Sequence, residues 1–237
     1  DKREFDNFQF VSPEEKEELA AILKEWEGQT FEDLTAVQYT EEELEAIEVG
    51  VMTKGVSKQS TMCMNPDYPE MVKVGYRYYI DECKQKLEAL EKEEMTLEKM
   101  NRKYTWQAMI IVMEAIIDFA HRYADLAEKM AAQCKDEKRK AELLTMAADC
   151  RVVPENPPQT FQQVLQLVLI THCAIMIENN GYHHPIGRLD QYLYPFYEKA
   201  LAEGQSEEFL TDLLHEFKLR FEEMWYLRSA GEAEAYP

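Results

Sequence analysis

Two long segments of this 237-residue chain are apolar almost all the way round, and they constrain its fold more than any other feature. One is 106–120, inside a helix-period segment that spans 104–133. The other is 164–177, inside a second such segment, 160–178. A helix that is apolar on every side is buried on most sides. No series of alternating strand-like runs accompanies them. The pattern therefore predicts a mostly α-helical chain built round central helices, with one or two short strands near the loops.

Helix-start signals place the shorter elements around these two segments. Ser12 followed by Pro13 and Glu15 combines a cap, a proline at the first helical position and a capping-box acid. Thr160 and Gln163 form the same kind of signal before the second apolar segment. The remaining predicted helices are 13–27, two short ones within 30–34 and 40–50, 67–90, 137–150, 189–203 and 207–227. No internal repeat or clear linker divides the chain, so we expect one domain over 1–237.

Composition excludes several classes of function. The formal net charge of −20 repels phosphate backbones and anionic membrane surfaces, so no nucleic-acid or membrane partner is expected. Polar residues interrupt the apolar run 164–177, which is shorter than a membrane span. The first ten residues lack the apolar segment of a signal peptide, which predicts a cytoplasmic location. The five cysteines are odd in number and lack C-x-x-C spacing, so we interpret them as free thiols.

Two D-x-x-H pairs are the strongest metal signals in the chain. Asp118 with His121, and Asp212 with His215, each share one helix face, as Glu-x-x-His pairs do in helical di-iron proteins. Both acids are the shorter Asp, and no matching pair of inward Glu residues accompanies them. Ordinary Asp–His surface contacts are the favoured interpretation, and we predict no metal.

The segment 178–197, ENNGYHHPIGRLDQYLYPFY, departs from the helical pattern. It contains two adjacent histidines, two glycines, two prolines and four tyrosines. His183 and His184 are adjacent, so on an extended segment they point to opposite sides and rarely bind one ion together. They are either ordinary loop histidines or functional groups displayed between two buried helices, which is where rigid scaffolds commonly carry function.

From Arg122 onward the chain resembles the pyruvate-formate-lyase-like domain of the glycyl radical enzymes. The resemblance rests on spaced identities over about seventy residues, and weaker ones in 24–34 and 214–224 extend it over most of the chain. The matching residues are Arg122-Tyr123-Ala124, Arg139, Glu142-Leu143, Cys150, Val153-Pro154, Pro157-Pro158, Thr160-Phe161, Leu165-Gln166, Glu178, Asn180-Gly181, Gly187-Arg188 and Asp190-Gln191. The fold that the resemblance implies is a ten-stranded α/β barrel of two half-barrels, surrounded by helices.

The same resemblance exposes a gap. Family members are several times longer, and their chemistry uses a radical-storing glycine in an R-V-x-G context and a thiyl cysteine in a G-C-x-E-like loop. Neither motif occurs in these residues, and Arg151-Val152-Val153-Pro154 carries proline where the glycine would stand. We therefore expect an N-terminal-half fragment, incomplete at both ends: the outer helices and part of one half-barrel, without a catalytic residue or bound cofactor of its own. The parent enzyme would carry a glycyl radical.

The resemblance also gives the unusual loop a role. In family members the residues between the NG and GR motifs touch the substrate, and the spacing from Gly181 to Gly187 is the same here. Tyr182 and His183 are the predicted substrate-binding residues, with His184 and Pro185 as weaker candidates. His183 could donate a hydrogen bond or act as acid or base, because its ordinary pKa lies near neutrality. Arg188 and Asp190 are interpreted as a structural ion pair or helix cap.

One departure from the family pattern bears on the substrate. Dehydratase-like members carry GH..PDY where this chain has Met62-Cys63-Met64-Asn65-Pro66-Asp67-Tyr68. Replacing that histidine by Cys63 weakens a diol-dehydratase assignment and favours a less polar substrate such as an aryl or alkyl acid, unless Met62, Cys63 and Met64 simply fill a core.

Three functions remain open at this stage. The first is a fragment of a radical lyase that carries out dehydration, decarboxylation or C–N or C–S cleavage on a small organic acid or alcohol. The second is radical addition of a hydrocarbon to fumarate. The third is a non-catalytic helical remnant or interaction subunit. The resemblance implies a small-molecule substrate, a homodimer, and a separate activating enzyme that uses S-adenosylmethionine and an iron–sulfur cluster.

Overall fold

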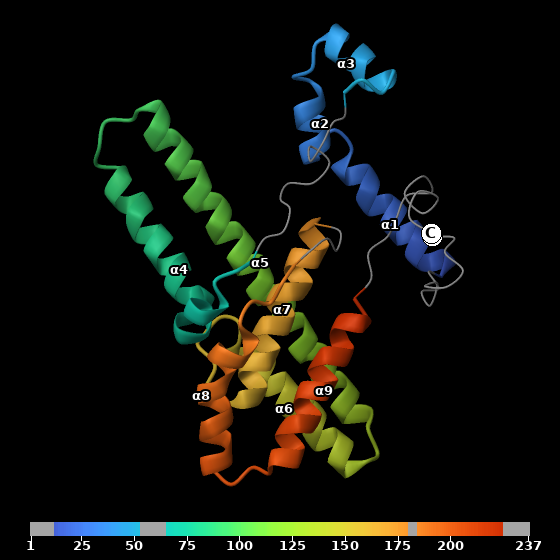
Figure 1. Ribbon diagram of the computed structural model, residues 1–237, viewed down its shortest axis with the longest axis vertical. Coiled ribbons are helices and arrows are strands. Elements are labelled where there is room, and N and C mark those ends of the chain that lie inside the picture. Colours follow the sequence, from blue (N-terminus) through green and yellow to red (C-terminus); the bar gives the residue numbers. More distant parts are fainter. Residues whose placement is uncertain (1–11, 53–64, 180–183, 225–237) are drawn as a thin grey trace. The chain divides into compact units, whose positions relative to one another are not determined.

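Helices are the regular elements of the part of the chain that the structure describes, residues 12–52, 65–179 and 184–224 of a computed structural model (Figure 1). Within those ranges no strand occurs, so the predicted short strands are wrong there, whereas the predicted mostly helical class is confirmed. The helices are α1 Pro13–Trp26, α2 Phe31–Ala36, α3 Glu41–Glu48, α4 Tyr68–Leu90, α5 Leu97–Gln133, α6 Glu137–Val152, α7 Phe161–Asn179, α8 Leu189–Ala202 and α9 Glu207–Glu222.

The helices fall into two compact units. The described part of the first unit is 12–52 with 176–179, and that of the second is 65–175 with 184–224. The prediction of a single domain over 1–237 stays a prediction.

Capping boxes start all three short helices of the first unit. In α1 the amide of Glu15 donates to Ser12 Oγ at 3.2 Å, and the Ser12 amide donates to the Glu15 carboxylate at 2.7 Å. The same reciprocal pairs start α2 at Thr30 and α3 at Thr40. The capping signal at Ser12 is thereby confirmed. Neither α1 nor α3 has a buried residue.

Helix α4 is interrupted at Gly75, which has φ +68° and ψ 175°. The connection between α6 and α7 packs against this interruption. The amide of Tyr76 donates to the Pro154 carbonyl and the amide of Arg77 donates to the Glu155 carbonyl, both at 2.9 Å. The side chains of Arg77 and Glu155 form an ion pair beside them, with Nε to Oε1 at 3.0 Å. A predicted continuous helix over 67–90 is therefore two helical pieces joined at a glycine.

Helix α5 starts earlier and is more exposed than the sequence suggested. Thr96 caps it, its Oγ1 accepting from the Lys99 amide at 3.3 Å, so the helix includes residues 97–103. Buried Ile117 lies on the face that packs into the main core, whereas Ile111 is 67% exposed. Burial on most sides is thus wrong for 106–120. The reason is that the elements of this unit pack against one face of the helix and leave the other uncovered.

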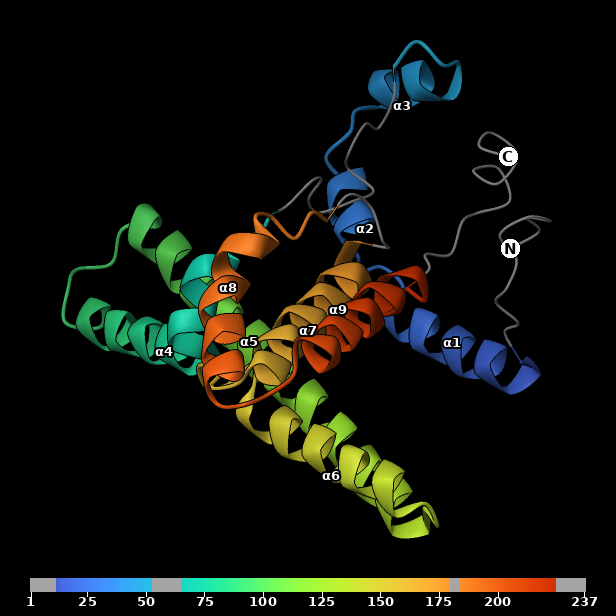
Figure 2. The ribbon, with the colours of Figure 1, turned by 60° about the horizontal axis from the view of Figure 1, so that its bottom comes forward.

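The second half of α5 packs closely on α6 through small side chains. Ala120, Ala124 and Ala127 of α5 are buried with Ala147 and Cys150 of α6. Small residues allow two helix backbones to approach closely, so the pair forms a tight hairpin, which Figure 2 shows below α7.

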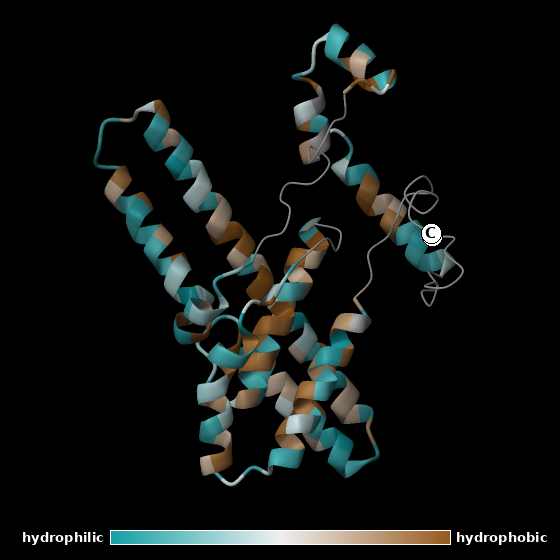
Figure 3. Ribbon diagram, viewed as in Figure 1, coloured by the Kyte–Doolittle hydropathy of each residue, from teal (hydrophilic) through white to brown (hydrophobic). Residues whose placement is uncertain are grey.

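Helix α7 is the central helix of the main core. Val164, Leu167 and Val168 are fully buried there, and Figure 3 shows the hydrophobic residues that run along it. The predicted start is confirmed, since Thr160 Oγ1 accepts from the Gln163 amide at 3.1 Å. In a full capping box the Gln163 side chain would accept from the Thr160 amide. Here it accepts from the amide of Gln159, the residue before the cap. The core residues are Tyr68, Met71, Val72, Tyr76, Ile80, Ile117, Val153, Phe161, Val164, Leu165, Leu167, Val168, Tyr192, Leu193, Ala200, Leu210 and Phe217.

By length and composition alone, residues 161–178 of α7 could cross a membrane, which corrects the expectation that no run was long enough. Nearly half of that window is buried among the other helices, as in the core helix of a soluble protein. Helix α9 ends at Glu222, earlier than predicted, and residues 225–227 of that prediction lie outside the described part.

Candidate substrate-binding site

The unusual segment, 178–197, includes the end of α7 (178–179) and the first nine residues of α8 (189–197). Tyr182 and His183, the two principal predicted substrate-binding residues, lie outside the described residues, as do Met62, Cys63 and Met64. The third predicted residue, His184, opens the described stretch that leads into α8, and it is partly buried. We call residues 184–187 the return limb. Its contacts define the part of the candidate site that the structure describes.

Three contacts from three different parts of the fold hold the return limb. The Tyr192 hydroxyl of α8 donates to the Ile186 carbonyl at 2.8 Å. The His184 ring packs edge-to-face on the His172 ring of α7, with centroids 6.2 Å apart and planes at 80°. Gly187, at φ +66°, is so close to Asn65 that an added Cβ would lie 3.4 Å from the side-chain amide. The limb is thus fixed by α7, by α8 and by the segment before α4.

His172 is the least expected member of the site. It is 6% exposed, and its ring also packs against Phe221 of α9, with centroids 4.5 Å apart. Burial, with a smaller contribution from nearby His184, lowers the pKa of His172 to about 4. The imidazole is therefore neutral near pH 7. Its Nδ1 is buried and has no hydrogen-bond partner among the described residues.

A second buried tyrosine packs on Tyr192, which holds the return limb. Tyr68 stacks on Tyr192 with ring centroids 5.8 Å apart, and its hydroxyl is buried with no hydrogen-bond partner in the described ranges. Burial raises the pKa of both phenols, so both stay protonated. The Tyr76 hydroxyl, in contrast, is bonded to Thr171 Oγ1 at 2.9 Å. These groups can donate or accept hydrogen bonds but carry no charge at neutral pH.

Arg188 and Asp190 lie at the start of α8. Arg188 is the N-cap residue by its backbone, but its side chain makes no cap bond. Asp190 lies in the first turn, where a carboxylate interacts favourably with the helix dipole. No ion pair joins the two side chains in the described structure. Of the two predicted structural roles, the geometry therefore supports the position of Arg188 at the cap of α8 and not the ion pair.

The described cysteines do not form a reactive centre. Cys173 Sγ lies 3.8 Å from Met224 Sδ, and burial raises the pKa of its thiol. Cys150 is 2% exposed, and burial raises its pKa to about 11. Cys83, Cys134, Cys150 and Cys173 are all free.

The D-x-x-H pairs gain no further ligands. His121 Nε2 is 3.9 Å from Glu155 Oε2, which belongs to the connection that packs on Gly75. His215 is exposed on α9. Over the ranges that the structure describes, no group of three or more His, Cys, Asp or Glu side chains is arranged to bind a metal.

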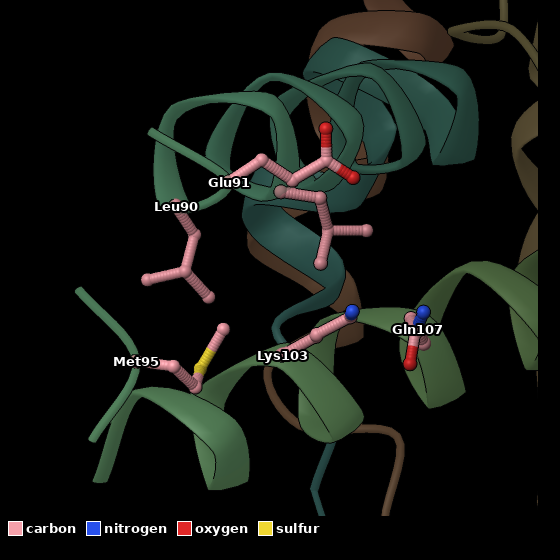
Figure 4. A pocket seen from close by; sticks show the side chains of 6 residues that line it. Leu90, Glu91, Met95, Lys103 and Gln107 are labelled. Atoms are coloured by element: carbon pink, nitrogen blue, oxygen red, sulfur yellow. The ribbon is translucent and has the colours of Figure 1, made fainter. Parts of the chain in front are cut away.

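A shallow pocket lies away from this site, near the loop that connects α4 to α5. Its volume is about 110 Å³, below the size typical of ligand sites. Figure 4 shows Leu90 and Met95 facing each other across it, with Lys103 and Gln107 on α5. The pocket is small and none of its lining residues belongs to the return limb, so we do not include it in the candidate site.

Comparison with known proteins identifies the family. The pyruvate formate lyase-like family model matches residues 1–237, and the chain belongs to that family. The chain is 33% identical over 218 residues to a (2S)-3-sulfopropanediol dehydratase of Klebsiella oxytoca, covering 90% of this chain and 26% of that protein. It is 41% identical over 143 residues to an isethionate sulfite-lyase of Nitratidesulfovibrio vulgaris, covering 60% of this chain and 17% of that protein.

A solved structure agrees with this membership. The glycerol-bound B12-independent glycerol dehydratase of Clostridium butyricum superposes with a TM-score of 0.79 at 28% identity, over 94% of this chain and 28% of that one. The sequence-based resemblance to glycyl radical enzymes is confirmed. The chain spans about a quarter of the length of the curated relatives that match most of it.

Sequence reasoning missed most residues that hold the return limb. His172 counted only as a polar interruption of an apolar run, and Tyr68 only as part of a family motif. A histidine inside an otherwise apolar helix is itself a signal, because a polar group buried in a core needs an explanation. Tyr192 carried no separate signal, since its partner is a backbone carbonyl.

Proposed function

We propose that this chain is the N-terminal part of a glycyl radical enzyme that carries out lyase chemistry on a small organic acid or alcohol. The reaction classes are dehydration, decarboxylation, and C–N or C–S cleavage. The observation that carries the proposal is the family match over the whole chain, together with relatives named as dehydratases and a sulfite-lyase. Those names favour lyase chemistry over the alternative, addition of a hydrocarbon to fumarate.

The residues of this chain do not supply the radical machinery. Cys83 and Cys150 are buried in the helices, and none of the described cysteines has the G-C-x-E context of the thiyl residue. In the proposed enzyme, a glycyl radical elsewhere in the polypeptide would supply hydrogen-atom abstraction. We assign to this chain the binding and orientation of the substrate and the exclusion of water.

Binding is assigned to the loop that the return limb closes. Tyr182 and His183 are the proposed substrate contacts, with His184 as a weaker candidate. The neutral His172 and the protonated Tyr192 contact the limb, and the protonated Tyr68 packs on Tyr192, so none of the three places a charge there. Uncharged donors and acceptors suit hydroxyl and carboxylate groups of a small substrate.

The wider assembly follows from the same proposal. The helices described here would lie outside a ten-stranded barrel, of which this chain supplies part of one half. A separate activating enzyme with S-adenosylmethionine and an iron–sulfur cluster would install the radical. The protein would be a cytoplasmic homodimer.

The test is to activate the complete polypeptide anaerobically and to record its electron paramagnetic resonance spectrum. A glycyl radical signal should appear, and one of a panel of substrates should be consumed: glycerol, 1,2-propanediol, isethionate, hydroxyproline or an arylacetate. Turnover of fumarate with a hydrocarbon would instead support the alternative reaction. A complete native polypeptide with a mass near 27.8 kDa and no radical signal would refute the proposal and leave a non-catalytic subunit.

A further inference from the structure

The uncovered face of α5 is apolar along most of its length. We call its six large exposed residues the α5 stripe: Tyr104, Ile111, Val112, Tyr123, Leu126 and Met130. Ala108 and Ala115, which are also exposed, and the half-buried Phe119 lie between them. Successive members of this series are three or four residues apart, so they form one continuous line on the helix surface.

The stripe lies away from the side of α5 that packs. Ile117 is buried in the main core, and Ala120 and Ala124 are buried on α6. From residue 104 to residue 119 the stripe contains no charged residue, which is unusual for a helix face in water. Single exposed apolar side chains are normal on a protein surface, whereas a contiguous apolar patch marks a surface that another segment or partner covers.

The dimensions of the stripe limit what can cover it. From Tyr104 to Met130 it is about 40 Å long. The longest helix in the described part of the first unit, α1, has 14 residues and is about 21 Å long, so it cannot cover the whole stripe. A second copy that met only this strip, about 10 Å wide, would bury about 400 Å² per partner. That is half of the roughly 800 Å² per partner of a stable complex.

The lengths of the relatives favour a covalently joined occupant. This chain covers 26% of the sulfopropanediol dehydratase and 28% of the glycerol dehydratase structure, on which it superposes with a TM-score of 0.79. In these relatives the same fold is therefore part of a polypeptide most of which lies outside it. A segment of the same polypeptide loses little translational freedom when it packs, so a narrow apolar strip is enough to hold it.

We propose that the α5 stripe is the surface through which this part of the protein packs on an apolar surface of the remaining polypeptide, outside residues 1–237. The inference deepens the proposed function and rests on it, because it takes the chain to be the N-terminal part of a longer enzyme. In the complete protein α5 is then buried on most sides, as the apolar pattern of 106–120 predicts.

The first experiment is hydroxyl-radical footprinting of the complete wild-type polypeptide before activation, read out by mass spectrometry. Tyr104 and Tyr123 report on the stripe, and Tyr78 of α4 is the matched control, since Tyr78 and Tyr123 are both 52% exposed in the structure. Both stripe tyrosines should be oxidised about fivefold or more slowly than Tyr78, because a covered side chain keeps little accessible area. Equal rates for all three tyrosines, or protection of only one stripe tyrosine, would overturn the proposal.

A photo-cross-link identifies the occupant. Tyr104→p-benzoylphenylalanine in the complete polypeptide, irradiated, should give a product with the mass of one chain, in which residue 104 is joined to a peptide outside 1–237. Tyr78→p-benzoylphenylalanine is the control and should give little of such a product. A product of doubled mass, cross-links only to peptides within 1–237, or a yield no greater than in the control would overturn the proposal. If the Tyr104 variant does not fold, the footprint of the wild-type protein decides by itself.

The outcomes separate this inference from the proposed function. An unprotected stripe in a long polypeptide that carries a glycyl radical and has lyase activity would refute the inference alone. A protected stripe, cross-linked as expected, in a long polypeptide without radical or lyase activity would refute the proposed function alone.

Discussion

Replacing Gly75 by alanine should destabilise the fold more than any other glycine-to-alanine change in the described residues. An added Cβ would lie 2.6 Å from the Asn156 carbonyl carbon and 2.7 Å from the Glu155 carbonyl oxygen. Both are backbone atoms of the connection between α6 and α7, so neither can move away by a change of rotamer. The positive φ of +68° adds backbone strain in any residue with a side chain.

The size of the effect follows from these contacts. Backbone strain at such a position costs about 1–3 kcal/mol. Moving the connection away breaks the two hydrogen bonds donated by Tyr76 and Arg77, at about 1 kcal/mol each. The expected total is a loss of about 3–5 kcal/mol.

Gly204 provides a matched control. Its φ is +91°, yet an added Cβ there meets no atom within 4 Å. Gly204→Ala therefore carries the strain without the clash and should cost about 1–2 kcal/mol. The free energy of unfolding of both variants and of wild type would be measured by urea denaturation followed by circular dichroism. A loss in Gly75→Ala no greater than in Gly204→Ala would refute the reasoning.

Three further predictions concern buried polar groups. Burial raises the pKa of Asp149 although the Gln163 amide donates a hydrogen bond to it, so the ionised carboxylate destabilises the folded state. Asp149→Asn should therefore be more stable than wild type at pH 7. In urea titrations this difference in the free energy of unfolding should shrink as the pH falls toward 3.8. The pKa of His172 is lowered from 6.5 to about 4 in the folded state, so as the pH falls the unfolded chain is protonated at this histidine before the folded chain is. The free energy of unfolding should therefore fall by about 3 kcal/mol between pH 6.5 and 4. His172→Phe should lack this loss. Tyr192→Phe removes the hydrogen bond to the Ile186 carbonyl and should lower the free energy of unfolding by about 1 kcal/mol. As a second readout, diethyl pyrocarbonate should modify His184 faster in this variant. Unchanged stability and an unchanged modification rate would contradict the role of Tyr192 in holding the return limb.

Local sequence signals predicted the local structure well. The caps at Ser12 and Thr160 start helices as expected, because a side-chain oxygen and the amides it accepts lie within one turn of each other. The apolar pattern of α7 predicted the central helix of the core for a similar reason, since its burial requires only that other helices surround it.

The errors arise where a distant segment decides the outcome. Gly75 lies in a helical pattern, and the connection that interrupts the helix there comes from Pro154 to Asn156. The exposure of Ile111 depends on which elements pack beside α5, which no pattern within the helix records. The contact of His172 with His184 likewise joins two segments whose pairing is set by the tertiary fold.

Helix α5 has a mechanical consequence for the second unit. Its 37 residues form one helix about 55 Å long, packed on α4 in its first half and on α6 in its second. A continuous helix of this length resists bending, because backbone hydrogen bonds join every turn to the next. A torque applied through the α6 hairpin is therefore transmitted along the axis to the α4 hairpin. The α4–α5 and α5–α6 hairpins can change their mutual angle only if this helix bends or breaks at one turn and the bonds from Tyr76 and Arg77 to the α6–α7 connection give way.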